Sequence, residues 1–204
     1  HLPPVYETVL PNGLRVVLVE DGRFPLVTVR LGFLAGARVD PRDLPGLSEA
    51  AGALLTEGTE KRTSRQIAEQ LAAIGGSLRG AASADSLTLY GNSLAEHIAV
   101  LIDLLADVSR NANFPEEEVA IHKNRRQQEL LAERSEAAFW ADEKFASMVF
   151  GSHPYSRLSP TPESIEKLDR KILAGFSDSF LLPNNAVLIL LGALPPRAEA
   201  MKLV

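Results

Sequence analysis

Cysteine is absent from the 204 residues, and the chain holds only one tryptophan and two methionines. The absence of cysteine excludes disulfide bonds, thiolate metal sites and catalysis by a thiol nucleophile. Any metal site in this chain would have to be built from histidine, aspartate and glutamate.

Long hydrophobic runs and a surplus of positive charge are absent as well. The longest apolar stretches, such as residues 186–194, fall far short of the roughly 20 residues that a membrane-spanning helix needs. The chain has 21 Lys and Arg against 26 Asp and Glu, which gives a formal net charge of -5. The short apolar runs lead us to expect no membrane span. Because binding to phosphate groups draws on a surplus of Lys and Arg, we also expect no nucleic-acid partner.

The residues that are present have the composition of a globular protein, with 46% hydrophobic and 23% charged side chains. A chain of this length can bury roughly 70% of the surface that it exposes when unfolded, which is enough for one sizeable core. We therefore predict a single domain over residues 1–204.

Turn residues and hydrophobic periodicity predict a mixture of strands and helices. The Val- and Leu-rich segments 14–20 and 26–34 are predicted strands, and the Asp21-Gly22 turn between them favours their antiparallel pairing. The other expected elements are helices at 47–55, at 64–74 with Ser64 as N-cap, at 94–108 and from Pro115 onward, two short helices after Pro162, and strands at 84–90 and 186–191. Hairpins mixed with helices favour an α+β fold with an antiparallel sheet.

Basic residues are concentrated at one place, in the long helix that follows Pro115. The cluster consists of His122, Lys123, Arg125 and Arg126. We interpret it as a solvated helix face, because charge runs in helices most often face water. The alternative is a binding site for an acidic partner.

Four stretches of the sequence, taken in order, resemble the pitrilysin or insulinase-type (M16) family of zinc peptidases. They are LPNGLRVVLVED from Leu10, PGLSEAAGALLTEGT from Pro45, HPYSRLSPTPESIEKL from His153 and LPNNAVLILLG from Leu182. The resemblance covers nearly the whole chain. It implies the M16-type α/β roll, a mainly antiparallel sheet packed against helices (the LuxS/MPP-like metallohydrolase fold). It also implies that residues 1–204 form an amino-terminal domain whose carboxy-terminal partner domain lies outside this chain.

The segment that resembles the family's zinc helix lacks the groups of the zinc motif. In active members this helix carries H-x-x-E-H, which places two imidazoles and a carboxylate on one face. The histidines bind zinc, and the glutamate activates the metal-bound water. The resemblance places the two histidine positions at Glu49 and Ala53 and the catalytic glutamate at Gly52. Since Gly52 and Ala53 carry no group that binds metal or moves a proton, we expect no catalytic residue and no zinc in this chain.

The third zinc ligand of the family is a glutamate on a later helix, and the resemblance places it at Glu129. A second family glutamate, seven positions earlier, corresponds to His122. An alternative metal site built from Glu49, His122 and Glu129 is therefore one hypothesis. The other is that Glu129 pairs with a neighbouring arginine or is simply exposed, while the small residues of 50–53 let helices pack closely against each other.

The resemblance implies a non-catalytic subunit, a pseudo-peptidase that is not an enzyme by itself. Family members commonly work as paired halves that enclose a chamber, so the implied partners are a zinc-bearing M16-like homologue in a heterodimer and an extended peptide substrate added to a sheet edge. The alternative is a structural or assembly scaffold of the same fold without peptide handling. An active metalloenzyme using the substitute ligands is a third reading. By resemblance alone, the bacterial periplasm or cell envelope is favoured as the location.

Overall fold

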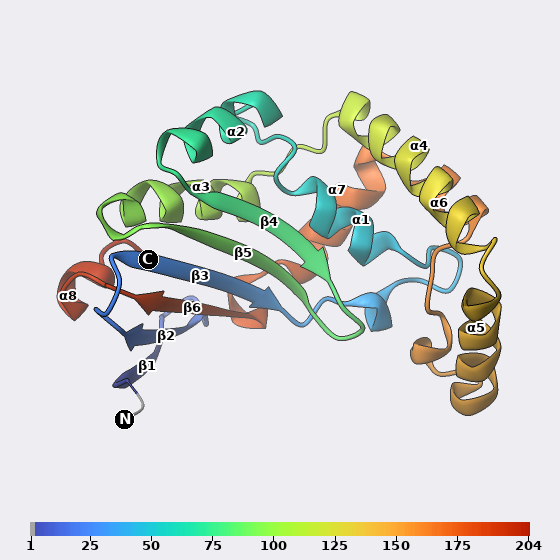
Figure 1. Cartoon of the computed structure of the whole chain (residues 1–204), viewed down its shortest axis with the longest axis horizontal. Helices are drawn as coiled ribbons and strands as arrows, with labels where there is room; N and C mark the ends of the chain where they lie inside the picture. Colours follow the sequence, from blue (N-terminus) through green and yellow to red (C-terminus); the bar gives the residue numbers. More distant parts are fainter. Residues whose placement is uncertain (1–2) are drawn as a thin grey trace.

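One six-stranded sheet, in the order β1-β2-β6-β3-β5-β4, forms the centre of the computed structural model, which describes residues 3–204 (Figure 1). The strands are β1 (Val5–Val9), β2 (Arg15–Glu20), β3 (Leu26–Phe33), β4 (Ser77–Ala82), β5 (Leu87–Leu94) and β6 (Ala186–Gly192). β2 and β6 run parallel, and the other four neighbouring pairs are antiparallel. This is the mainly antiparallel α+β fold that the sequence predicts.

The predicted pairing of the second and third strands with each other is wrong. β6 lies between β2 and β3 and pairs with both, so that Leu188 stands opposite Val16 on one side and Leu31 on the other. The segment of β6 is an unbroken apolar run, which is typical of a strand in the middle of a sheet. The turn at Asp21-Gly22 makes β2 and β3 run in opposite directions whether they pair directly or have β6 between them. The residues of the turn therefore could not reveal the inserted strand.

Eight α-helices are described between residues 3 and 204. They are α1 (Leu47–Leu54), α2 (Ser64–Ala73), α3 (Ile98–Arg110), α4 (Glu116–Glu133), α5 (Ala137–Phe150), α6 (Pro162–Lys167), α7 (Arg170–Phe180) and α8 (Arg197–Ala200). The predicted cap of α2 is one residue off: the Thr63 side chain accepts from the Gln66 amide and the Gln66 side chain accepts from the Thr63 amide, a capping box. None of these helices is long and apolar enough to cross a membrane.

Other boundaries also differ from the prediction. β4 was not predicted, because Gly80 and the alanines of its sequence SLRGAA give no strand signal. The next strand starts at Leu87 and continues to Leu94, so α3 begins only at Ile98. Pro115 is the residue before α4 and not part of its first turn.

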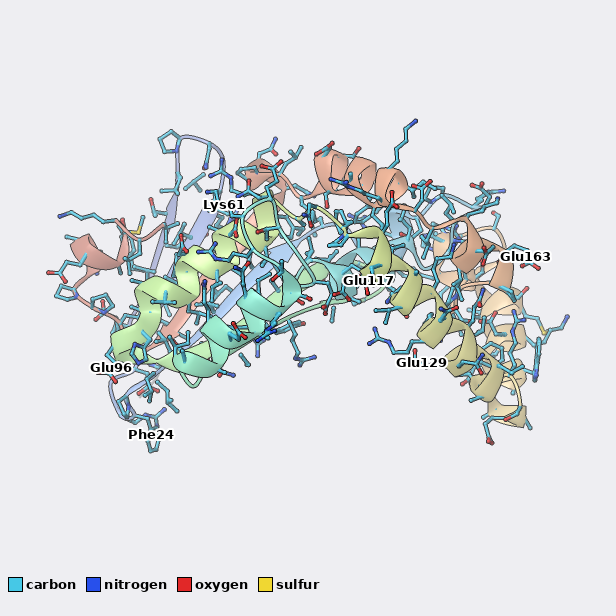
Figure 2. The ribbon with its side chains drawn as sticks, turned by 90° about the horizontal axis from the view of Figure 1, so that it is seen from above. Phe24, Lys61, Glu96, Glu117, Glu129 and Glu163 are labelled. Carbon is cyan, nitrogen blue, oxygen red and sulfur yellow. The ribbon has the colours of Figure 1, made fainter. Side chains whose placement is uncertain are left out.

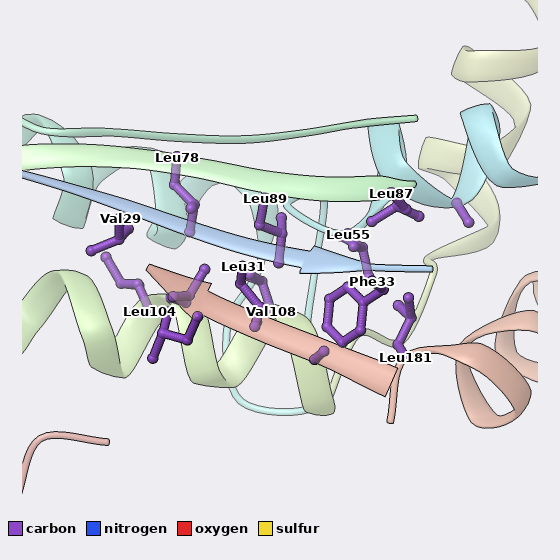
Figure 3. Packing of buried hydrophobic residues seen from close by; sticks show 14 of the residues in the cluster. Val29, Leu31, Phe33, Leu55, Leu78, Leu87, Leu89, Leu104, Val108 and Leu181 are labelled. Carbon is purple, nitrogen blue, oxygen red and sulfur yellow. The ribbon is translucent and has the colours of Figure 1, made fainter. Parts of the chain in front are cut away.

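The hydrophobic core lies between one face of the sheet and the helices that cover it. Alternate residues of β3 and β5 point into this core, and Figure 3 shows Leu31 and Leu89 of these strands among the same buried side chains as Leu104 and Val108 of α3. Burial of such side chains stabilises the fold by roughly 1.5–3 kcal/mol each. α4, α6 and α5 extend beyond the end of the sheet as an arm (Figure 1).

Candidate functional site at helices α1 and α4

The start of helix α1 is held by a buried aspartate in the preceding loop. Asp40, only 4% exposed, accepts hydrogen bonds from the Gly46 amide at 3.0 Å, the Ser48 amide at 2.9 Å and the Ser48 hydroxyl at 3.2 Å. Gly46 itself has φ of 91°, a left-handed conformation that favours glycine. Burial raises the pKa of Asp40 above its ordinary value, and the hydrogen bonds from Ser48 and Gly46 oppose that rise. These contacts fix the direction in which α1 leaves the loop.

The face of α1 that would carry the zinc motif is packed against the edge strand β4. A Cβ at Gly52 would lie 3.3 Å from the carbonyl carbon of Ala81, which is tighter than nine in ten real Cβ contacts. On the opposite side of the same contact, a Cβ at Gly80 would collide with the Gly52 carbonyl oxygen. Two backbones therefore meet at the position to which the resemblance assigns the catalytic glutamate. The small residues of 50–53 permit close packing against this strand, and α1 also packs against α7 and α4.

The basic cluster on α4 is not a solvated face, contrary to the sequence-based interpretation. His122 is 5% exposed and Arg126 is 8% exposed, whereas Arg125 keeps 60% of its side chain in water. His122 and Arg126 lie one helical turn apart and share the buried stripe of α4 with Val119 and Leu130. Burial lowers the pKa of His122, and the nearby charge of Arg125 lowers it further.

Arg126 is surrounded by carboxylates from two helices. Its Nε donates to Glu49 Oε1 at 2.7 Å, and its two terminal nitrogens donate to Glu133 at 3.0 and 3.3 Å. One terminal nitrogen also lies 3.9 Å from Glu129 Oε2. Burial alone would lower the pKa of Arg126, but Glu49 and Glu133 outweigh it and the net shift is upward. Arg126 is thus a permanently charged link between α1 and α4.

Glu129, at the family's third ligand position, is half-exposed and lies within ion-pair distance of two arginines. Arg125 approaches it to 3.8 Å and Arg126 to 3.9 Å. Figure 2 places Glu129 on the outer part of α4, well beyond Glu117 near the start of the helix. The pairing of Glu129 with neighbouring arginines agrees with the second of the two sequence-based hypotheses for this residue.

The side chains present here do not fit the zinc ion that the family motif would hold. The positions at Gly52 and Ala53 supply no donor, and the carboxylate of Glu49 is taken up by Arg126. Among residues 3–204, no group of three or more His, Asp and Glu has an arrangement that could hold a metal ion. The alternative site of Glu49, His122 and Glu129 is not assembled, because the guanidinium of Arg126 contacts two of its members.

A cavity of about 490 Å³ opens beside the start of α1. Glu49 lies on one side of it and residues 82–84, at the end of the edge strand, on another. The lining also includes Tyr155, whose hydroxyl donates to Asp85 at 2.6 Å, and Arg157, which donates to the Asp40 carbonyl at 3.1 Å. The cavity therefore lies between the start of α1 and the end of the edge strand β4.

Sequence reasoning identified Glu49, Gly52, Ala53 and Glu129 as positions of interest but missed the partners that organise them. Arg126 appeared only as one member of a basic cluster. Its pairing with Glu133, seven residues later on the same helix, follows helical spacing and was available as a signal. Its pairing with Glu49 joins residues that are 77 positions apart in the sequence, and no local sequence pattern predicts such a contact.

These features fit the class of protein that the sequence indicates: a mainly antiparallel α/β roll of the metallopeptidase type. The model of the insulinase family of peptidases (peptidase family M16) matches residues 15–158. The chain belongs to this family.

The proteins similar to this chain are considerably longer than it is. A probable mitochondrial-processing peptidase subunit beta of Arabidopsis thaliana is 26% identical over 196 residues, covering 94% of this chain but 36% of that protein. An uncharacterized zinc protease of Mycobacterium leprae is 26% identical over 189 residues, covering 92% of this chain and 42% of that protein. The chain thus spans less than half the length of these relatives.

Two solved structures show the same fold. A peptidase M16 inactive domain from Pseudomonas fluorescens superposes with a TM-score of 0.92 at 25% identity, covering 98% of this chain and 49% of that one. Pitrilysin superposes with a TM-score of 0.85 at 20% identity, covering 98% of this chain and 22% of that one.

Proposed function

We propose that this chain is a non-catalytic, peptide-binding part of an M16 peptidase assembly, in which a zinc-bearing homologue supplies the chemistry. The observation that carries the proposal is the contact between Gly52 and β4. Gly52 stands at the position to which the resemblance assigns the catalytic glutamate, and a Cβ added there would lie 3.3 Å from the Ala81 backbone, so a long side chain would crowd the strand. A domain built in this way retains a binding wall and lacks a means to activate water.

The peptide-binding half of the proposal is supported by the edge strand and the cavity beside it. Within residues 3–204, β4 has β5 as its only strand neighbour, so its outer backbone groups remain free to pair with an added strand. Main-chain hydrogen bonds at a sheet edge require no metal. The 490 Å³ cavity at the end of β4 could receive a side chain of such a peptide.

The partner half of the proposal is supported by the relatives. One solved relative is described as an inactive domain, and one sequence relative is named as a subunit of a processing peptidase. Both are consistent with a division between catalytic and non-catalytic parts. The implied partner is a zinc-bearing M16-like homologue that carries an intact H-x-x-E-H motif.

A peptidase assay on that homologue, with and without this protein, tests the proposal. We expect the mixture to cleave unstructured peptides faster than the homologue alone, and the two proteins to co-elute in size-exclusion chromatography. Leu158→Arg, which places a charged side chain in the cavity wall, is expected to reduce the stimulation without preventing co-elution. Leu94→Arg, at the far end of β5, is the matched control and should behave as the wild type.

A structural scaffold without peptide handling is the second candidate, and the exposed apolar surface of α5 favours it. Only Ala146 of this helix is buried, while Trp140, Phe145 and Met148 are 54%, 67% and 76% exposed. Exposed apolar surface of this kind is typical of protein contacts. Equal peptidase activity with and without the chain, together with no complex with the homologue, would leave the scaffold as the better reading.

The cell envelope stays our proposed location, by family resemblance. Fractionation of the source cells tests it, and recovery of the protein in the cytoplasmic fraction alone would contradict it.

A further inference from the structure

The guanidinium of Arg126 lies among carboxylates in the way that a bound cation does. Glu49 on α1 and Glu133 on α4 each accept from it at 3.0 Å or less, and Glu129 lies 3.9 Å away. The side chain of Arg126 is only 10% exposed, whereas those three carboxylates are 43% to 51% exposed. One buried cation therefore serves three acidic groups.

The positions that Arg126 joins are those at which the family motif holds its metal. Glu49 stands at the first histidine position and Glu129 at the last ligand position. With no cation between them, these carboxylates and Glu133 would repel one another and oppose the approach of α1 to α4. An arginine suits the place because it stays charged when buried and its planar fork can bind several carboxylates at once.

We propose that Arg126 is a built-in cation that replaces the metal ion as the link between α1 and α4. Its guanidinium joins Glu49, at the former first ligand position, to Glu129 and Glu133. This role is independent of whether the chain binds peptides.

Arg125 is a matched comparison within the same helix. It also pairs with Glu129, at 3.8 Å, but 60% of its side chain is exposed. Exposed pairs at this spacing contribute little to stability. The proposal therefore predicts different behaviour for two adjacent arginines that share one acidic neighbour.

The test measures the thermal unfolding midpoint of the chain, its Arg126→Ala variant and its Arg125→Ala variant, with and without millimolar Mn²⁺ or Zn²⁺ at constant ionic strength. We expect Arg126→Ala to lower the midpoint more than Arg125→Ala does. Carboxylate oxygens are suitable ligands for Mn²⁺. The metal is therefore expected to raise the midpoint of Arg126→Ala in a concentration-dependent manner and to leave the wild type unchanged. Adding Glu49→Gln to Arg126→Ala should abolish that rise.

Three results would overturn the proposal. They are no metal-dependent rise in Arg126→Ala, a rise that persists after Glu49→Gln is added, and an equal loss of stability in the two arginine variants. If Arg126→Ala does not fold without metal, its refolding yield becomes the measurement. Recovery of folded protein in Mn²⁺ supports the proposal, and no recovery in Mn²⁺ overturns it.

Discussion

Gly80→Ala tests whether the contact between α1 and β4 is as tight as the structure indicates. The added Cβ would collide with the Gly52 carbonyl oxygen, and it would lie 3.0 Å from the Gly52 carbonyl carbon and 3.3 Å from Leu89 Cδ2. Two of these atoms belong to the backbone of α1, and Leu89 is fully buried. The collision can therefore be relieved only by moving the helix away from the strand.

The expected cost follows from two opposing terms. Overpacking of this kind typically costs about 1–3 kcal/mol, and a collision with backbone belongs at the upper end of that range. Replacing glycine by alanine also restricts the unfolded chain, which offsets about 0.4–1 kcal/mol of the cost. We expect a net loss of about 2 kcal/mol in the free energy of unfolding, equivalent to a fall of about 4–8 °C in the melting midpoint for a chain of this size.

Urea denaturation of Gly80→Ala and of a matched control, Gly175→Ala, measures this difference. Gly175 is an exposed residue of α7, and a Cβ there would meet nothing within 4 Å. The same chemical change at this site should stabilise the chain by about 0.5–1 kcal/mol, because alanine is the better helix former. If Gly80→Ala unfolds within about 0.5 kcal/mol of the wild type, the variation seen for ordinary surface substitutions, the tight contact does not exist.

Two further predictions concern groups buried around α1 and α4. The pKa of His122 is lowered from 6.5, so the contribution of His122 to stability is complete above pH 6.5 and declines as the pH falls below that value, because the unfolded chain then takes up a proton more readily than the folded chain does. His122→Gln should therefore flatten this part of the plot of unfolding free energy against pH, measured by urea denaturation. An unchanged slope would contradict the lowered pKa. Asp40→Ala leaves two amides at the start of α1 without their acceptor and should cost about 1–2 kcal/mol, whereas Asp43→Ala, which removes an exposed carboxylate, should cost far less in the same assay.

The parts of the fold that the sequence predicted are those with strong local signals. The apolar run at 186–191 and the periodic segment at 94–108 correspond to β6 and α3, although α3 starts four residues later. β4 was missed because small residues such as Gly80 are needed where α1 packs closely against the strand. This requirement comes from tertiary packing and not from local strand propensity. The place of β6 between β2 and β3 depends on pairing between distant segments, and no turn residue records it.

The candidate site was predictable in its positions but not in its chemistry. Anchoring the motif helix by its flanking residues placed Glu49 and Gly52 on α1, and the structure brings Glu49 to the Arg126 side chain that also contacts Glu129. The basic cluster was misread because a run of charged letters does not show which residues face the interior. Helical spacing from Val119 to Arg126 and Leu130 would have indicated that Arg126 lies on the buried stripe.

The residues at the three positions that the resemblance assigns to the zinc motif are best understood as parts of one packed junction and not as three separate substitutions. A side chain at Gly52 would begin 3.3 Å from the Ala81 backbone, so the absence of a catalytic carboxylate is coupled to the position of β4. Glu49 could not become an imidazole without depriving Arg126 of its acceptor on α1. Each change is thus held in place by a neighbour that suits it. This mutual dependence is what close packing requires where a helix, a strand and a buried charge meet.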